Sequence, residues 1–494
     1  MSDRISRRGL LAGALASVGT ATFANAPLTA PRPVPRGGAP VIFQSDPTAG
    51  FIAKANLGGD IGFVLRDLDS GEVLAARDAD LALPPASTLK AVTALYGLER
   101  LGAGHTFRTR LLTTGGLSNG RIEGDLILIS DGDPTLDTDR LLELAKALKA
   151  AGVTSCSGRF LVWGGALPEV DRIAAGQPDV AGYNPAVGGL NLNFNRVHFN
   201  WKREGDGYDT SLLARGVTAS PETTVARVQV VEEQSPVFVH ATGHARDFWT
   251  VAEGALGKEG ARWLPVRHPA RYAGDVFRAL AKAEGVRLPS VELADGPPSG
   301  ARDLAEVAGP ALQTVLRGML KYSTNLTAEV TGLRSSLSNG VPVANLVSSG
   351  ARMSGWAAAR FGVGRPRFVD HSGLGYGSAM TAEDMSKILQ GGADTELPQL
   401  LKSVNLALDN KNPAPAGAAA FAKTGTLNFV NSLAGYIDTS TGRRAAFAIF
   451  CADVARRDAV PLGSRDRPNG GRSYARRARV LQKQLLRYWA SFPA

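Results

Sequence analysis

Residues 84–101 read PPASTLKAVTALYGLERL. The pattern predicts a helix from Ala86 to about Leu101, because two prolines precede a run of good helix formers. Apolar residues lie nearly all round this helix, which indicates a buried helix at the centre of a domain. Ser87 falls in its first turn, and Lys90 follows three residues later on the same face.

Strand patterns occur on both sides of this helix. Residues 61–68 and 72–76 predict a hairpin around the turn Asp69-Ser70-Gly71. The last part of the chain predicts strands at 433–438 and 443–451 and then a helix at 473–491.

The middle of the chain has a different pattern. Strands return at 106–136, and residues 140–305 mix short strands and turns with helical pieces at 141–151 and 273–285. A helical stretch resumes near Pro310 and contains Ser323.

The spacing of Ser87 and Lys90 suits a serine nucleophile. A neutral serine hydroxyl is a weak nucleophile and needs a nearby base. One helical turn brings the lysine amine within reach of the serine oxygen, and burial lowers the pKa of a lysine towards that of a base. Taken alone, such a tetrapeptide is expected about once by chance in a chain of this length.

Two further strings follow in order. Ser323-Thr324-Asn325 lies in the predicted helical stretch, where a helix N-cap or a surface turn is the simpler interpretation. Lys423-Thr424-Gly425-Thr426 precedes a strand-rich segment, where the glycine would let a substrate backbone lie along a strand edge, although an ordinary turn has a similar composition. Together and in this order, the three strings favour one serine acyl-transfer site.

These strings are the motif set of β-lactamases and penicillin-binding proteins. The whole mature chain resembles the D-alanyl-D-alanine carboxypeptidase/endopeptidases of the penicillin-binding protein 4 type. Strings outside the three motifs carry the same resemblance: residues 132–136, 183–187, 190–193, 272–274, 325–329 and 370–374. The sequence departs from the family at Thr324, where Asp or Asn is usual, and we expect this change to affect loop packing without abolishing activity.

The resemblance implies a catalytic mechanism. Ser87 would attack the carbonyl between the two terminal D-alanines of a peptidoglycan stem peptide, and Lys90 would accept its proton. Ser323 would relay a proton to the leaving nitrogen. The backbone N–H groups of Ser87 and Thr426 would form the oxyanion hole.

The same resemblance assigns substrate binding. Asn325 would hold the substrate amide, and Lys423 and Thr424, in the motif that includes Gly425, would bind the terminal carboxylate. The expected partners are peptidoglycan stem peptides and β-lactam inhibitors, and no cofactor or metal is expected.

The implied fold class is α/β (α+β). A serine β-lactamase/transpeptidase-like domain, with an antiparallel sheet flanked by helices, would be interrupted by a large, mainly-β inserted region of one or two subdomains. The 236 residues from Ser87 to Ser323 exceed what a compact β-lactamase requires. The expected division is a signal peptide at 1–26, the first part of the domain at 27–104, the insertion at 105–305 and the second part at 306–494.

The beginning of the chain predicts export. The string Ser6-Arg7-Arg8-Gly9-Leu10-Leu11 and the weakly apolar stretch after it are typical of a cleaved twin-arginine signal, with a Sec signal that contains Arg-Arg as the alternative. The apolar stretch is too short and too polar to span a bilayer. We therefore expect a periplasmic protein with at most peripheral membrane association.

Composition excludes several classes of function. The net charge of +10 fits an anionic envelope partner, and no Lys/Arg cluster interleaved with aromatic residues indicates nucleic acid binding. Cys156 and Cys451 are too few for a disulfide framework and read as small buried hydrophobic residues; whether they pair stays open. His240 and His244 lie four residues apart without a nearby acidic ligand, which favours a surface pair over a metal site.

Two alternatives remain open. A β-lactamase or a related serine esterase would use the same three motifs and would differ in deacylation, although no Glu-x-x-Leu-Asn string occurs. A non-catalytic peptidoglycan-binding protein could keep the fold, but the intact serine and lysine positions argue against it.

Overall fold

The computed structural model describes residues 47–296, 299–407, 412–466 and 468–493. The predicted signal peptide and the start of the predicted first domain part lie outside these residues. The described chain begins with helix α2, Pro47–Ala55. No helix within the described residues is long and apolar enough to cross a membrane.

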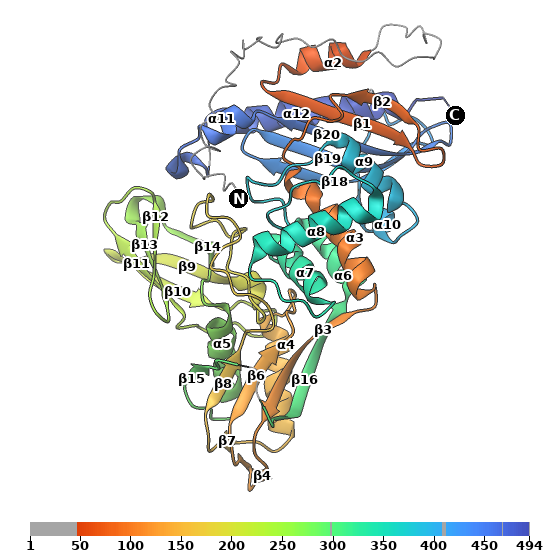
Figure 1. Cartoon of the computed structure of the whole chain (residues 1–494). Helices are drawn as coiled ribbons and strands as arrows, with labels where there is room; N and C mark the ends of the chain where they lie inside the picture. The colour runs from red at the N-terminus through yellow and green to blue at the C-terminus, as the bar shows by residue number, and fades with distance from the viewer. Residues whose placement is uncertain (1–46, 297–298, 408–411, 467, 494) are drawn as a thin grey trace, which may run out of the picture. The chain divides into compact units, whose positions relative to one another are not determined.

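An antiparallel six-stranded sheet carries the first and the last described strands (Figure 1). Its strand order is β17-β18-β19-β20-β1-β2, so that β1 from the start of the chain pairs with β20 from its end. The strands are β1 Asp60–Asp67, β2 Val73–Arg77, β17 Lys402–Ser403, β18 Ala419–Leu427, β19 Val430–Asp438 and β20 Arg444–Ala452.

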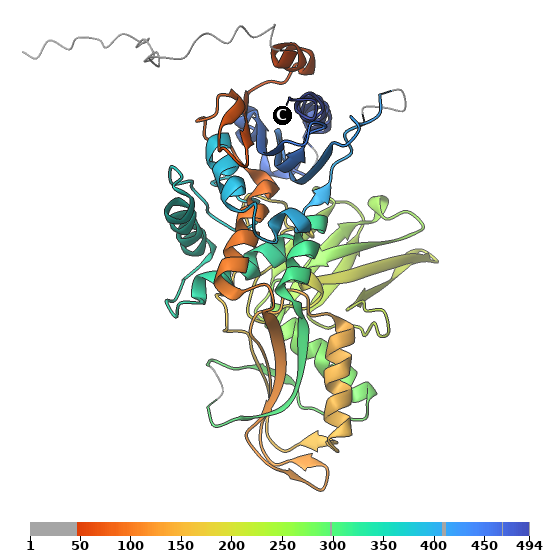
Figure 2. The ribbon, with the colours of Figure 1, turned by 90° about the vertical axis from the view of Figure 1, so that its right-hand side faces the viewer.

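The two faces of this sheet pack against different helices (Figure 1, Figure 2). In β20, Ala446, Ala448 and Phe450 pack in one hydrophobic core, while Phe447 and Ile449 pack in another. This alternation is the period of two that a buried strand imposes on its side chains. The second core contains the C-terminal helix α12, Gly471–Trp489, which the sequence predicted as a helix at 473–491.

Helix α3, Leu89–Leu101, is the central helix of the first core. Every residue from Leu89 to Gly97 is buried, which confirms the prediction of a helix that is enclosed on all sides. The other helices of this core come from the second half of the chain. Four of them contact α3: α6 Leu312–Tyr322, α7 Asn325–Leu337, α8 Leu346–Phe361 and α10 Leu397–Leu400, while α9, Ala382–Gly391, packs on the six-stranded sheet and on α8.

A second sheet lies between α3 and α6 in the sequence. Its order is β15-β8-β6-β3-β16, and its first and last strands in the chain, β3 and β16, are antiparallel neighbours. Leu312 N donates to the carbonyl oxygen of His105 at 2.7 Å. The chain therefore enters this region and leaves it at neighbouring points beside the helical core. The strands are β3 Thr106–Thr113, β6 Leu126–Ser130, β8 Phe160–Trp163, β15 Val291–Leu293 and β16 Arg302–Ala311.

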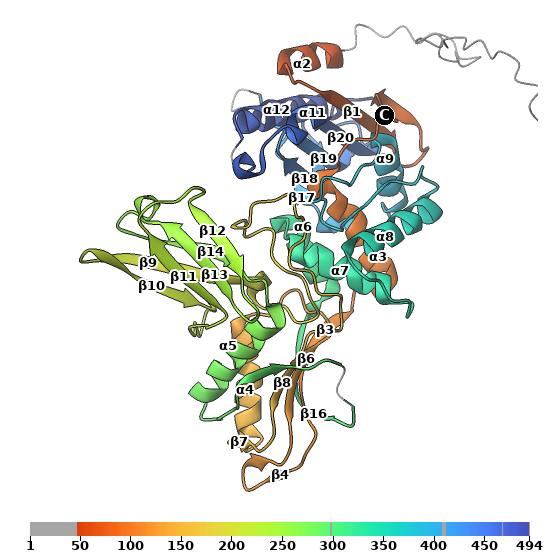
Figure 3. The same cartoon turned by 60° about the vertical axis from the view of Figure 1, so that its left-hand side comes forward.

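Two helices and three smaller sheets complete this region (Figure 3). Helices α4, Thr138–Ala150, and α5, Pro269–Ala283, share one hydrophobic core with residues of the five-stranded sheet and of both larger three-stranded sheets. The sheet β10-β9-β14 contains Gly207–Leu213, Arg196–Glu204 and Glu259–Pro265. The sheet β11-β13-β12 contains Ala226–Val231, Asp247–Ala252 and Phe238–Thr242, and the smallest sheet contains β4 Leu117–Ser118, β5 Arg121–Ile122 and β7 Ser155–Cys156.

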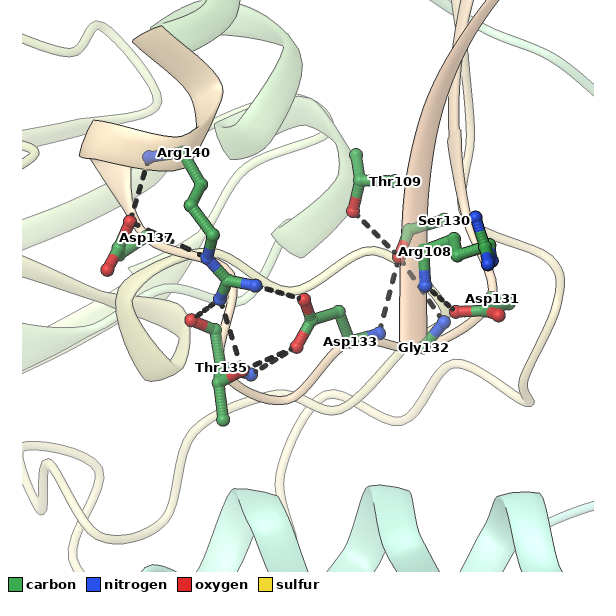
Figure 4. A network of polar contacts seen from close by, with 9 residues as sticks. All are labelled: Arg108, Thr109, Ser130, Asp131, Gly132, Asp133, Thr135, Asp137 and Arg140. Atoms are coloured by element: carbon green, nitrogen blue, oxygen red, sulfur yellow. Dashed lines mark hydrogen bonds and ion pairs between the residues drawn. The ribbon is translucent and has the colours of Figure 1, made fainter. Parts of the chain in front are cut away.

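A polar network fixes the turn between β6 and α4 (Figure 4). Asp133 is 1% exposed; its carboxylate accepts from Thr135 N at 2.8 Å and from Arg140 Nη1 at 2.6 Å. Ser130 Oγ accepts from Asp133 N at 3.3 Å. A buried carboxylate needs such donors, and these contacts explain the conformation of the string at residues 132–136.

The fold class is confirmed: antiparallel sheets and helices form a mixed domain, and a large region rich in strands interrupts it between α3 and α6.

Candidate active site

A tight turn presents Ser87 at the start of α3. Ala86 has a φ of 48°, and residues Ala86–Thr88 form a 3₁₀ turn directly before the helix. Thr88 Oγ1 donates to the carbonyl oxygen of Pro85 at 2.6 Å. In the run from Leu83 to Lys90, Ser87 alone is not fully buried, and it lines a cleft of about 940 Å³. The local fold therefore exposes Ser87, the predicted nucleophile, and buries the residues on both sides of it.

Lys90 lies beneath the cleft and is fully buried. Its Nζ donates to Ser87 Oγ at 2.9 Å, to Asn325 Oδ1 at 2.7 Å and to the carbonyl oxygen of Ser372 at 2.8 Å. Burial lowers the pKa of Lys90 to about 8, although the carboxylates of Glu329 and Asp370 oppose this shift. An amine with this pKa has a substantial deprotonated fraction at mildly alkaline pH, and in contact with a serine hydroxyl it can act as a general base.

Two buried carboxylates organise the backbone around Lys90. Glu329 accepts from the N–H groups of His371 and Ser372, each at 2.9 Å. Asp370 accepts from Gly373 N at 2.9 Å and from Gly375 N at 2.5 Å. Burial raises the pKa of both acids. These contacts hold the carbonyl group of Ser372 where it accepts from Lys90.

The second motif lies at a break between two helices. The helical stretch expected from Pro310 is interrupted here, in line with the helix N-cap or turn interpretation of the motif: α6 ends at Tyr322, and Ser323 has a left-handed conformation with a φ of 59°. Helix α7 then begins at Asn325. The break turns Ser323 and Asn325 into the same cleft as Ser87. A left-handed non-glycine residue is uncommon and is often found at functional sites.

Asn325 connects three parts of the chain. Its Oδ1 accepts from Lys90, and its Nδ2 donates to the carbonyl oxygen of Tyr183, in the region inserted between α3 and α6, at 2.8 Å. An amide nitrogen carries two hydrogens, so a second N–H remains that could bind a substrate. The sequence contained no signal for the Tyr183 contact, because the partners are 142 residues apart.

The third motif lies within β18, whereas the sequence predicted only that it precedes a strand-rich segment. Strand β17 pairs with Ala422 and Phe421, and Val404 N donates to the carbonyl oxygen of Ala420 at 2.8 Å. Backbone groups alternate along a strand, so those of Thr424 and Thr426 face this same edge, beyond the last residue paired with β17. The N–H of Thr426 is therefore directed to the edge where an oxyanion hole is expected.

Lys423 is buried on the Ser87 side of β18. Its side chain is 2% exposed, and its Nζ donates to the carbonyl oxygen of Thr424 at 2.6 Å. Burial and the nearby ammonium group of Lys90 lower the pKa of Lys423 to about 6. Thr424 and Thr426 are exposed on the other face of the strand.

Gly425 lies directly against the turn that carries Ser87. A Cβ at this position would lie 2.9 Å from Ser87 N, from the carbonyl oxygen of Pro85 and from the Cβ of Ala86. The sequence suggested that this glycine makes room for a substrate backbone along the strand edge. The structure gives a different reason: the absence of a side chain allows β18 to approach the turn that carries Ser87. The two backbone donors proposed for the oxyanion hole depend on this approach.

Among the predicted site residues, Ser87, Ser323, Asn325 and Thr426 line one cleft, Lys90 contacts two of them, and Lys423, Thr424 and Gly425 belong to the strand beside it. Sequence reasoning missed the roles of Glu329 and Asp370. Both acids lie in strings that carry the family resemblance. An acidic residue beside apolar neighbours was the feature of the sequence that could have indicated a buried carboxylate.

The histidine prediction was partly wrong. His240 Nε2 lies 2.8 Å from Asp247 Oδ1, and both side chains are almost fully buried, so His240 is neither a surface residue nor without an acidic neighbour. No group of three or more metal-ligating side chains occurs within the described residues. Cys156 and Cys451 are free, and Cys451 is buried in the core beside α12.

We predict that Gly425→Ala slows acylation of Ser87 by a fluorescent penicillin. The new Cβ displaces β18 from the nucleophile turn, and a misplacement of about 1 Å costs on the order of 10² in rate. Gly318→Ala is the matched control, because a Cβ there meets nothing within 4 Å. A folded Gly425→Ala protein that acylates as fast as the unaltered protein would contradict this role.

Comparisons with known proteins agree with this geometry. The chain is 28% identical over 422 residues to the D-alanyl-D-alanine carboxypeptidase of Actinomadura sp. (strain R39), covering 78% of this chain and 76% of that one. It is 22% identical to the D-alanyl-D-alanine carboxypeptidase DacB of Haemophilus influenzae, covering 80% and 85% of the two chains. The crystal structure of penicillin binding protein 4 (dacB) from Haemophilus influenzae superposes with a TM-score of 0.75 at 19% identity, covering 90% of this chain and 99% of that one.

The family described as D-Ala-D-Ala carboxypeptidase 3 (S13) matches residues 48–465. This range contains all three motifs and the whole of the region between them. The chain belongs to the D-Ala-D-Ala carboxypeptidase 3 (S13) family.

Proposed function

We propose that this protein cleaves D-alanyl-D-alanine bonds of peptidoglycan stem peptides through an acyl-enzyme on Ser87. By family it is a serine D-alanyl-D-alanine carboxypeptidase. The observation that carries the assignment of residues is the buried amine of Lys90, which lies 2.9 Å from Ser87 Oγ and has a lowered pKa. A base placed in this way converts a weak nucleophile into an effective one.

In the proposed first step, Lys90 Nζ takes the proton of the Ser87 hydroxyl as Oγ attacks the carbonyl carbon. The backbone N–H groups of Ser87 and Thr426 stabilise the oxyanion, and such donors are worth on the order of 10² to 10³ in rate. The C–N bond then breaks, and the leaving amine of D-alanine takes a proton through Ser323. Water attacks the ester that remains, which releases the shortened peptide and restores Ser87.

The remaining motif residues bind substrate in this proposal. Asn325 uses its second amide N–H, while its contacts to Lys90 and Tyr183 hold it in place. Thr424 and Gly425 present the strand edge, and Lys423 orders that edge through its bond to the Thr424 carbonyl group. A β-lactam is an amide that offers the same serine a carbonyl carbon, so penicillins act as inhibitors.

The division of the chain remains a proposal. We place the signal at 1–26, the two parts of the catalytic domain at 27–104 and 306–494, and the insertion at 105–305. The five-stranded sheet supports an insertion of this extent, and because its last strand, β16, ends at Ala311, we propose to move the boundary with the second catalytic part from 305 to 311.

The substrate and the relatives support a location outside the cytoplasm. We propose that residues 1–26 are a cleaved twin-arginine signal and that the protein acts in the periplasm. Arg7 and Arg8 precede the weakly apolar stretch that carries this proposal.

We predict that the mature protein isolated from its natural host begins near residue 25 or 27. N-terminal sequencing of the purified protein tests this. Replacement of Arg7 and Arg8 by lysine should then leave the precursor uncut, because the twin-arginine route requires the arginine pair. Retention of Met1 in the exported protein would contradict the signal, and normal processing of the lysine variant would contradict the route.

We predict that purified peptidoglycan incubated with the protein loses terminal D-alanine, which product masses report. Loss of cross-linked dimers in the same digest shows endopeptidase activity, and each bond cleaved adds one water to the products. Ser87→Ala should abolish both reactions, because no nucleophile remains. Unchanged masses with a folded protein that binds peptidoglycan would instead support a non-catalytic binding protein.

A further inference from the structure

Helix α12 presents two arginines to the catalytic cleft. Arg472, Ala475 and Arg479 all line the cleft that contains Ser87 and Thr426. Their spacing of three and four residues places them along one side of the helix. Arg472 and Arg479 are exposed, whereas Ala475 is buried. One flank of α12 thus forms a wall of the cleft.

A chain of hydrogen bonds fixes this wall to the third motif. Gln482, three residues beyond Arg479, donates from Nε2 to the carbonyl oxygen of Asn431 at 3.2 Å. Asn431 Nδ2 in turn donates to Thr426 Oγ1 at 3.0 Å. The position of α12 relative to the end of β18 is therefore set by direct contacts.

The exposed hydroxyl groups of β18 lie on the same side as α12. Ala420 and Ala422 pack in the hydrophobic core that contains α12. Because side chains alternate along a strand, Thr424 and Thr426 share that face. Lys423 lies on the opposite face, buried, with its Nζ bound to the carbonyl oxygen of Thr424.

Arg472 and Arg479 are available to bind an anionic ligand in the cleft. The described lining contains three arginines and one acidic residue, Asp466. Arg465 donates to the carbonyl oxygens of Gly176 at 2.7 Å and Val460 at 3.2 Å, and so has a structural role. Within the described residues, neither Arg472 nor Arg479 forms an ion pair.

We propose that Arg479, assisted by Arg472, binds the carboxylate of the residue that leaves, next to the hydroxyl groups of Thr424 and Thr426. This subsite rests on the proposed peptidase function and deepens it. A guanidinium group offers paired donors that match a carboxylate, and it keeps its charge when partly desolvated. Lys423, enclosed behind the strand, then orders the strand edge and leaves direct charge recognition to α12.

The test compares two thioester substrates with one acyl group. In one, the leaving thiol carries a free carboxylate; in the other, that carboxylate is a methyl ester. Arg479→Ala should reduce kcat/KM for the free carboxylate about 10- to 100-fold, mostly through KM, because a charge-assisted contact is lost. For the methyl ester, kcat/KM should stay within about twofold, because no charged contact exists to lose. Arg472→Ala should act in the same direction.

Matched variants separate recognition from structure. Arg476→Ala removes an exposed arginine of the same helix that does not line the cleft, and it should leave both substrates unaffected. Arg479→Lys should restore part of the preference, because the charge returns without the paired donors.

Three outcomes would overturn the subsite: equal losses with both thioesters, no loss with either, or the same loss in Arg476→Ala. Hydrolysis of neither thioester by the unaltered protein would instead refute the proposed serine chemistry. The Ser87→Ala variant serves as a further control. If it no longer cleaves the thioester of the methyl ester substrate, that cleavage depends on Ser87, and the serine chemistry is supported whatever the effect of the Arg479 variants.

Discussion

The buried amine of Lys90 connects three segments of the candidate active site through hydrogen bonds. Its three acceptors are Ser87 on the turn before α3, Asn325 at the start of α7 and the carbonyl group of Ser372 in the loop before α9. These segments are up to 282 residues apart in sequence. If any one of them moved, the amine would lose a partner in a region that water does not reach, which is costly. The positions of the motifs are therefore coupled to one another through a single side chain.

Burying these ionisable groups lowers the stability of the folded state. A lysine and two carboxylates, Glu329 and Asp370, are fully buried together, and burial disfavours the charged form of each. Backbone N–H groups of the loop at residues 371–375 compensate the acids. The hydrophobic cores on both faces of the six-stranded sheet supply the stability that offsets this cost. A lowered lysine pKa is thus a consequence of the architecture.

Motif order and helix periodicity predicted the central helix, the sheet strands and several of the residues that lie around Ser87. The sequence could not predict features that depend on distant backbone. The bond from Asn325 to Tyr183, the approach of Gly425 to the Ser87 turn and the wall formed by Arg472 and Arg479 all require the folded arrangement. The sequence suggested an N-cap or a turn at the second motif, but the left-handed conformation of Ser323 could not be predicted, because residues on both sides favour helix. His240 was misjudged because its partner lies on a neighbouring strand.

The central claim is that Lys90, with its lowered pKa, is the base that activates Ser87. The most direct test is the rate at which penicillin acylates Ser87 as a function of pH, with the modified peptide identified by mass. A lysine acts as a base only when deprotonated, so the rate should rise with pH through an apparent pKa near 8. In Lys90→Met, which keeps the volume of the side chain, the rate should fall by about 10² to 10⁴ and lose this rise. A rate independent of pH, or a folded Lys90→Met protein that acylates as fast as the unaltered one, would contradict the account.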